Sequence, residues 1–388
     1  MLSLAMVIKN EVLTLERTIL QMKDYVDEII IGLDSQSDDG SEEIVRKYAD
    51  KVIPIHLSDE LAAQKSVDDS KEWGFAKARN KVLDACNPDA WRLTLDGHEL
   101  FKDPSRIPAA LAHAVSMGGD AIQVSVNMNP GNIGLSSNRF KSFRFIDPQM
   151  RYKHALHNSL KAHRVVACED LEVLHLNIEQ AQEDRDARVA QRVAVNIPQF
   201  KKEVVQNPKN VRGWRYLGAA YLEAKEFKKA AHAYTQALSY LELPRQRYMF
   251  HIWAALSEGS DGRKDYAQNH LEAAIVCWPE RVEAYYYFGE IAYTDGDNLK
   301  AIEWLEQGVK CSFPKEADDQ NIFMYEFQRY DLLAAAYGNT GQYEKAIEMA
   351  KRALAAVPDP RVARNIQAWQ WELDHSEPEP LILREASS

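Results

Sequence analysis

Cysteine is scarce in this sequence, and the few cysteines lie far apart along the chain. The 388 residues include four cysteines, Cys86, Cys168, Cys277 and Cys311, and none forms a Cys-x-x-Cys pair. Four widely spaced cysteines without this motif do not indicate a disulfide framework. We therefore expect reduced thiols and a cytoplasmic location.

Long apolar runs and excess basic charge are also missing. No stretch approaches the ~20 apolar residues that cross a bilayer. The apolar run Leu2–Ile8 is too short for the hydrophobic region of a signal peptide, and the polar residues Lys9-Asn10-Glu11 follow it directly. Lysine and arginine number 47 against 58 acidic residues, for a net charge of −11. Since nucleic acids and anionic membranes are bound by basic surfaces, we expect neither as the main partner.

The N-terminal half alternates short apolar runs with amphipathic stretches. The runs predict strands at 3–8, 29–33, 52–55, 91–95, 121–126 and 171–176. Helices between consecutive parallel strands indicate a doubly wound, Rossmann-like α/β sheet. Ligands of such sheets bind at the carboxyl ends of the strands. Asp34 and Asp96 both follow strands, so we expect them to face one crevice.

The most informative stretch is the strand 91–95 and the turn Asp96-Gly97-His98 after it. Residues i and i+2 of an extended chain project to the same side. A carboxylate and an imidazole could therefore reach one divalent ion, with Glu99 beside them. The alternative is a strand that ends in an acidic, solvated loop, and the short motif alone does not decide between the two. His175 lies in a later apolar strand, where an imidazole is more often a core residue than a ligand.

A basic and aromatic stretch at 139–164 also has two interpretations. It includes Arg144 among several arginines, lysines and histidines, interleaved with Phe143 and Phe145. A charge run is usually a solvated face. The interleaved aromatic residues favour an electropositive wall that meets a diphosphate or an anionic acceptor.

Four motifs in order resemble the family 2 glycosyltransferases of the GT-A fold. They are Met6–Glu11, Asp34–Ser41, Phe75–Asn80 and Leu95–Glu99, and the likeness continues through Phe143-Arg144, Tyr152, His157 and His175. The resemblance covers about the first 178 residues. The subgroup it is most similar to carries C-terminal tetratricopeptide repeats and includes glycocin S-glycosyltransferases and relatives of lipopolysaccharide-core glucosyltransferases.

The second half supports this resemblance through an internal repeat. Small and aromatic residues recur with a period of about 34, starting with Trp214, Gly218 and Tyr221, which is typical of tetratricopeptide repeats. We expect a GT-A domain at 1–178, a helical connector at 179–208, a repeat domain at 209–375 and a flexible tail at 376–388. Pro198 predicts a connector of two helices. The repeat domain would hold four repeats and a capping helix. The surplus tyrosines at 285–287 and 325–330 could line a groove, although packing within the repeats is preferred.

The resemblance implies a donor and a metal ion. The donor would be a UDP-sugar, with UDP-glucose favoured, and Mn²⁺ or Mg²⁺ would be held by Asp96, His98 and His175. A divalent ion neutralises the departing diphosphate, and a nitrogen ligand favours Mn²⁺. The implied nucleotide-sugar contacts are Lys9, Asn10, Glu11, Asp34, Ser37, Arg79, Asp96, Gly97, Arg144 and His157.

Two residues depart from the family pattern. His98 stands where most members have aspartate, and Asn158 stands where relatives have the glutamate that follows His157. An inverting transfer needs a base to deprotonate the acceptor, and asparagine cannot supply it. Asp147 and the pair Glu169-Asp170 are the substitutes, and we favour the pair as the catalytic base; its alternative is a solvated loop. A thiol acceptor would need no strong base.

Together these features predict a metal-dependent, inverting hexosyltransferase whose repeats recruit the acceptor or form a homodimer. A peptide or protein acceptor is favoured because such repeats bind proteins, which is an analogy at the level of the fold. A surface glycan or a lipid-linked acceptor comes next, and modified DNA is disfavoured by the net charge. A non-catalytic scaffold with a degenerate transferase domain is the alternative of a different class.

Overall fold

The chain forms two compact units. The computed structural model describes residues 1–57, 74–127, 138–153, 160, 162–176, 182–314 and 319–375. The first unit comprises Met1–Gln180 with Glu316–Asn321, and the second comprises Ala181–Lys315 with Ile322–Ser388. The tail at 376–388, expected to be flexible, lies outside the described residues.

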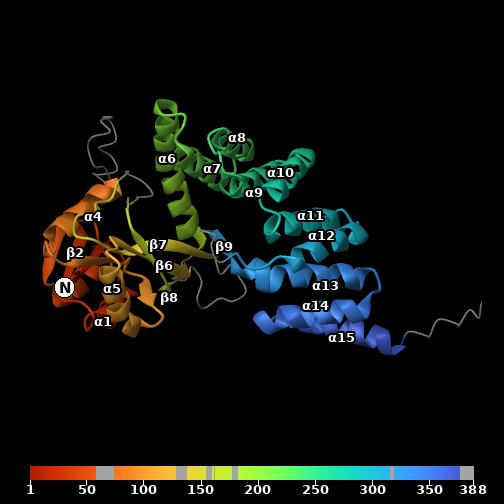
Figure 1. Cartoon of the computed structure of the whole chain (residues 1–388), viewed down its shortest axis with the longest axis horizontal. Helices are drawn as coiled ribbons and strands as arrows, with labels where there is room; N and C mark the ends of the chain where they lie inside the picture. Colours follow the sequence, from red (N-terminus) through yellow and green to blue (C-terminus); the bar gives the residue numbers. More distant parts are fainter. Residues whose placement is uncertain are drawn as a thin grey trace, which may run out of the picture. The chain divides into compact units, whose positions relative to one another are not determined.

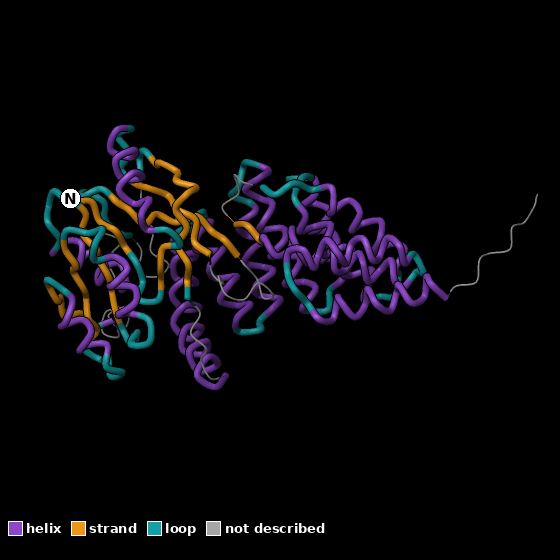
Figure 2. Tube along the Cα trace, turned by 90° about the horizontal axis from the view of Figure 1, so that it is seen from below, coloured by secondary structure: helices purple, strands orange, loops and turns teal. Residues whose placement is uncertain are grey.

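The first unit is built on one mixed sheet (Figures 1 and 2). The strand order is β3-β2-β1-β4-β7-β6-β8-β5, with β9 paired to β7. The strands are β1 (Leu2–Ile8), β2 (Glu28–Asp34), β3 (Lys51–Ile55), β4 (Trp91–Thr94), β5 (Glu99–Phe101), β6 (Ala121–Asn127), β7 (Asn138–Ile146), β8 (Val165–His175) and β9 (Asp319–Asn321). Strands β3, β2, β1 and β4 run parallel, whereas β7 lies antiparallel to both β4 and β6.

Helices cover both faces of this sheet. Successive side chains of a strand point to opposite faces, and apolar side chains on both faces pack against helices. The helices are α1 (Leu15–Met22), α2 (Ser41–Tyr48), α4 (Gly74–Ala85), η1 (Pro104–Arg106) and α5 (Ile107–Ser116). Leu4 and Met6 of β1 join the core formed with α1, α2 and α5. Ala5, between them, faces the opposite core, formed with α4. A strand that is apolar on both faces is thereby buried on both sides, which leaves its end as the place for polar side chains.

The predicted fold class is confirmed as a mixed α/β domain followed by helical repeats. The six predicted strands are present, with the fourth ending at Thr94 rather than Leu95. The sequence did not predict β5, β7 or β9. Strand β7 lies in the basic stretch, and its Phe145 is fully buried. The stretch was interpreted from its basic residues, so its strand character was not recognised.

The connector of the second unit contradicts the prediction of two helices. Helix α6 (Gln182–Gln206) continues through Pro198. An internal proline removes one backbone hydrogen bond and crowds the preceding turn. Packing on the next helix offsets that cost, because Phe200 is fully buried and stacks on Tyr216 with ring centroids 5.5 Å apart.

The predicted repeats form successive helix pairs (Figure 1). The helices are α7 (Val211–Glu223), α8 (Phe227–Leu238), α9 (Pro244–Ser260), α10 (Lys264–Cys277), α11 (Val282–Thr294), α12 (Asn298–Lys310), the π-helical turn η2 (Met324–Gln328), α13 (Arg329–Asn339), α14 (Tyr343–Ala356) and α15 (Pro360–His375).

Glycine allows close helix contact within the repeats, and the tyrosines fill the remaining space. A Cβ at Gly218 would lie 2.6 Å from the ring of Tyr234, and one at Gly289 would lie 2.5 Å from Leu305. Tyr286 and Tyr325 are buried in the repeat core, as the packing interpretation expects. Among the described residues, no helix combines the length and apolar character of a membrane span.

Candidate active site

The chain turns sharply after β1, at three residues predicted to bind the nucleotide sugar. Asn10 adopts the left-handed conformation, with φ of 54°, which asparagine tolerates better than most residues. Its amide donates to Ser37 Oγ at 3.2 Å, and its side chain donates to Asp38 at 2.9 Å. Lys9 Nζ donates to Gln36 at 3.2 Å. The two predicted motifs thus interlock, and this bonding fixes the turn.

Asp34 ends β2 and stabilises the same edge of the sheet. Its carboxylate accepts from the Gln36 and Leu57 amides, both at 2.8 Å. Lys9 Nζ lies 3.8 Å away, and Asp34 is 1% exposed. The structure therefore shows that Asp34 stabilises the strand end through one backbone donor on each carboxylate oxygen.

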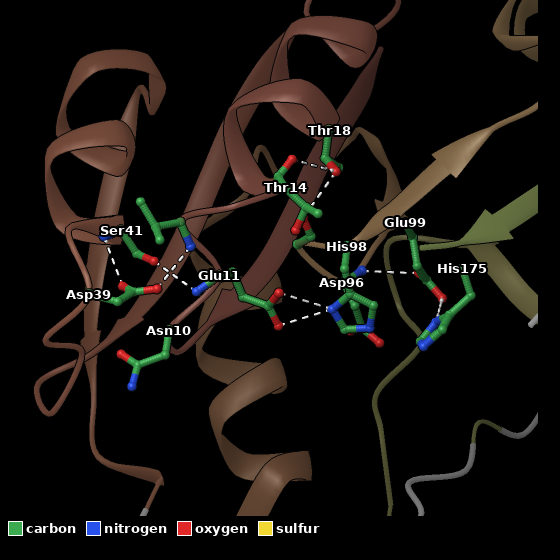
Figure 3. Close-up of polar contacts among 12 residues, drawn as sticks. Asn10, Glu11, Thr14, Thr18, Asp39, Ser41, Asp96, His98, Glu99 and His175 are labelled. Carbon is green, nitrogen blue, oxygen red and sulfur yellow. Dashed lines mark hydrogen bonds and ion pairs between the residues drawn. The ribbon is translucent and has the colours of Figure 1, made fainter. Parts of the chain in front are cut away.

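The turn after β4 brings Asp96 and His98 close to Glu11 of the first turn (Figure 3). Thr18 Oγ1 of α1 donates to the Gly97 carbonyl at 3.1 Å. A Cβ at Gly97 would lie 3.0 Å from both Cβ and Cγ of Glu11, a tight contact that glycine avoids. Asp96 and His98 are held at one end of the sheet as a result.

Glu99 links three predicted site residues, although the sequence assigned it no role. It is 1% exposed. Its carboxylate accepts from the Asp96 amide at 3.0 Å and from the Arg144 guanidinium, and lies 3.6 Å from His175 Nδ1. These contacts join the turn after β4 to strands β7 and β8. The signal in the sequence was a glutamate directly before an apolar pair of residues.

The two imidazoles lie together in this patch (Figure 3). The rings of His98 and His175 meet edge to face with centroids 4.3 Å apart. His98 Nδ1 lies 3.0 Å from each carboxylate oxygen of Glu11. The polar contacts of both rings within the described part of the chain are made through Nδ1.

Two arginines give the patch a positive side. Arg79 Nη2 lies 3.2 Å from Asp96, and its guanidinium covers the ring of Tyr152. Arg144 is 8% exposed, and its Nε has no partner among the described residues. Both arginines line a pocket, whose residues are Ala5, Val7, Arg79, Val82, Leu83, Thr94, Leu95, Asp96, Arg144 and Tyr152.

Charge pairing controls protonation in the patch. Burial alone would raise the pKa of Asp96. The charges of Arg79, Arg144 and the two histidines lower it by more than burial raises it, so the net pKa of Asp96 lies below its usual value. Burial lowers the pKa of His98, and Glu11, Asp96 and Glu99 more than offset this, so its net pKa is raised. The carboxylate is therefore the stable form of Asp96 near neutral pH.

The favoured catalytic pair is not brought into this patch. Glu169 and Asp170 lie in an irregularity of β8, where Cys168 and Glu172 flank the unpaired residues. Asp170 pairs with Arg106 at 3.2 Å. Five residues of strand separate Asp170 from His175, which is roughly 16 Å. Asp147 accepts from the Gln149 amide at 2.8 Å in a turn. His157 and Asn158 lie outside the described residues.

The donor chemistry of the patch fits a divalent ion. One carboxylate and two imidazoles suit Mn²⁺, and Asp96, His98 and His175 supply them. Within the described ranges, no three such side chains converge tightly enough to chelate an ion as they stand. Each instead faces a protein partner: Arg79, Glu11 or Glu99. Binding would require these side chains to turn toward the ion.

Comparison with known families finds one model that matches in each half of the chain. The family model described as glycosyl transferase family 2 matches residues 3–164, and a tetratricopeptide repeat model matches residues 254–317. The chain therefore carries a family 2 glycosyltransferase domain followed by tetratricopeptide repeats. This assignment supports a glycosyltransferase activity. These matches do not distinguish glycocin S-glycosyltransferases or lipopolysaccharide-core glucosyltransferases from other members of the family.

No match was found among curated proteins. Among solved structures, the chain is similar to MamA, with 20% identity and a TM-score of 0.35 over 46% of this chain and 96% of that one. It is also similar to YrrB, described as a tetratricopeptide repeat protein with an unusual peptide-binding site, with 17% identity and a TM-score of 0.33 over 48% and 86%. A thermophilic tetratricopeptide repeat protein of Thermus thermophilus gives 15% identity and a TM-score of 0.34 over 49% and 100%.

Proposed function

We propose that this protein is a metal-dependent, inverting glycosyltransferase that transfers a hexose from a UDP-sugar, with UDP-glucose favoured. The observation that carries the proposal is the patch at the end of β4. It gathers the carboxylate of Asp96, the imidazoles of His98 and His175, and two guanidinium groups. Anionic donors need this combination of metal ligands and fixed positive charge.

The chain's own groups would bind and orient the donor diphosphate. Asp96, His98 and His175 would hold Mn²⁺ or Mg²⁺, which supplies Lewis-acid neutralisation of the leaving diphosphate. Arg79 and Arg144 line the adjoining pocket and would face the phosphate oxygens. Arginine is suited to this role because its planar fork matches phosphate geometry. Arg79 would exchange its contact with Asp96 for one with the donor.

We favour a thiol of a peptide or protein as the acceptor. Asp170, predicted from sequence as part of the base, pairs with Arg106 at 3.2 Å. A cysteine thiol ionises near pH ~8.5, far below a hydroxyl, so it demands less of a base. The repeats favour a peptide or protein as the molecule that carries the thiol, since arrays of this kind present extended binding surfaces.

A thermal-shift screen tests this function. UDP-, GDP- and dTDP-sugars would each be added with and without Mn²⁺. We expect a UDP-sugar with Mn²⁺ to raise the melting temperature, because a ligand bound only to the folded state stabilises it. Asp96→Ala should abolish the shift. Asp89→Ala, on an exposed turn outside the patch, is the matched control and should preserve it. A scaffold whose transferase domain binds no nucleotide would show no shift with any donor.

A further inference from the structure

We propose that Tyr152 is a positioning residue, whose ring holds the guanidinium group of Arg79 where that group can meet the donor diphosphate. This inference rests on the proposed function, in which Arg79 contacts the phosphate oxygens. Both residues line the pocket beside Asp96. The sequence placed Tyr152 in the family resemblance but assigned it no role.

The guanidinium group of Arg79 lies over the ring of Tyr152. Its Cζ is 5.1 Å from the ring centroid, within the range in which an aromatic ring attracts a cation. That attraction acts on the charge of the whole guanidinium group. Because it does not depend on one N–H group, it can persist when Nη2 leaves Asp96, 3.2 Å away, for a phosphate oxygen. The ring therefore holds the group without competing for its hydrogen bonds.

Tyr152 is itself fixed at both ends. The side chain of Asn80 bonds the backbone of Tyr152 twice: its amide group donates to the Tyr152 carbonyl, and its carbonyl oxygen accepts from the Tyr152 amide, both at 2.9 Å. The Tyr152 hydroxyl donates to Thr94 Oγ1 at 3.2 Å, at the end of β4. Both Tyr152 and Asn80 are buried. The ring thus has a fixed position between α4 and β4.

Helix α4 carries the arginine and also holds the tyrosine. Asn80 directly follows Arg79 in the sequence. One turn later, Asp84 pairs with Arg151, the residue before Tyr152, at 2.7 Å. The helix therefore binds the segment that contains the ring close to the turn from which the guanidinium group extends. Ring and guanidinium group are placed by the same element, so their separation depends little on the rest of the domain.

The two arginines of the pocket are held by different means. Arg144 pairs with the buried carboxylate of Glu99. The Arg79 side chain is 29% exposed, and a long, exposed side chain loses rotamer freedom when a ligand immobilises it. A ring that already restricts Arg79 reduces that loss. Tyr152 should therefore act on donor affinity, beyond its contribution to the core formed with α4.

The test compares Tyr152→Leu and Tyr152→Phe with wild type in the full-length protein. The dissociation constant for UDP would be measured by calorimetry in the presence of Mn²⁺. We expect Tyr152→Leu to raise it roughly 3- to 10-fold, the factor for the cost of immobilising one long side chain. Tyr152→Phe keeps the ring and should match wild type. Tyr48→Leu, which removes a ring that contacts the Lys47 cation on α2, is the control and should also match wild type.

A double-mutant cycle separates positioning from general damage to the fold. In an Arg79→Ala background, Tyr152→Leu should cause no further loss of UDP affinity, because its effect passes through the missing guanidinium group. Equal losses in both backgrounds, or equal UDP affinity of Tyr152→Leu and wild type, would overturn the inference.

Nuclear magnetic resonance of protein with isotope-labelled arginine detects the contact without a ligand. The Arg79 Nε–H signal, identified by its loss in Arg79→Lys, should be shifted upfield by the ring current of Tyr152. The shift should persist in Tyr152→Phe and vanish in Tyr152→Leu, and an unshifted signal in wild type would also overturn the inference. Failure of wild type to bind UDP with Mn²⁺ would overturn the proposed function itself, whatever the position of this signal.

Discussion

The buried pair of Glu99 and Arg144 gives the prediction with the largest expected effect on stability. Glu99 is 1% exposed and Arg144 is 8% exposed. Glu99→Gln keeps the shape of the side chain but removes its charge. Removal of one member of a buried pair costs roughly 3–5 kcal/mol, because the remaining charge stays buried without a partner. The glutamine oxygen still accepts one hydrogen bond, so we expect a loss at the lower end, about 3 kcal/mol.

Hydrogen exchange measured by mass spectrometry would report this loss in the right place. The chain has two units, so a single melting curve would mix their transitions. Peptides that cover 91–101 contain β4, β5 and the Asp96 amide bonded to Glu99. Exchange there should accelerate on the order of 100-fold, the factor for about 3 kcal/mol. Arg144→Met in the same background should recover much of the loss, since it removes the unpaired charge.

An exposed ion pair supplies the matched control. Glu42 and Arg46 pair on α2 with side chains 51% and 69% exposed. Glu42→Gln should change stability by less than about 0.5 kcal/mol, as exposed pairs at this spacing do. If Glu99→Gln behaved like Glu42→Gln, the assignment of Glu99 as the buried link between β4, β7 and β8 would be refuted.

Three further predictions concern the proposed metal ligands and the repeats. His98→Asp should shift metal preference from Mn²⁺ toward Mg²⁺, because it replaces a nitrogen with an oxygen ligand; an unchanged preference in a competition titration would argue against ligation by His98. Gly218→Ala should destabilise the repeats by about 1–3 kcal/mol in denaturant unfolding, since its Cβ would meet the Tyr234 ring at 2.6 Å, whereas Gly259→Ala, with its nearest contact at 3.9 Å, should be neutral or stabilising. Burial of His251 beside His270 and Arg247 lowers its pKa from 6.5 to about 4. The folded repeats therefore bind fewer protons than the unfolded chain between these values, and stability should fall by roughly 3 kcal/mol as the pH drops from 6.5 to 4. His251→Gln should flatten that dependence in melting experiments, and an unchanged pH profile would contradict it.

The sequence predicted the fold well where its signals were local. The apolar run of β1 and the repeat period in α7–α14 depend on neighbouring residues, so both were visible without a structure. Strand β9 was not, because Asp319–Asn321 is short, polar and far in sequence from its partner β7. The unbroken helix α6 was missed for a similar reason: the tertiary packing of Phe200 outweighs the local effect of Pro198.

The sequence predicted that certain residues lie close together, but it did not predict which side chains they contact. Asp96, His98 and His175 lie in one patch, as the motif spacing and the resemblance suggested. The partners of the two imidazoles, Glu11 and Glu99, were not foreseen. His98 and Glu11 are 87 residues apart, and nothing in a single sequence encodes contact over that separation. The order of the strands creates it, because β1 and β4 are neighbours.

Calorimetric titration with UDP tests the central claim most directly. The account predicts that wild type binds UDP in the presence of Mn²⁺, that removal of Mn²⁺ with EDTA weakens binding strongly, and that Asp96→Ala abolishes the Mn²⁺-dependent part. If wild type showed no binding of UDP with Mn²⁺, and Asp96→Ala titrated like wild type, the assignment of this patch as a nucleotide-sugar site would be contradicted.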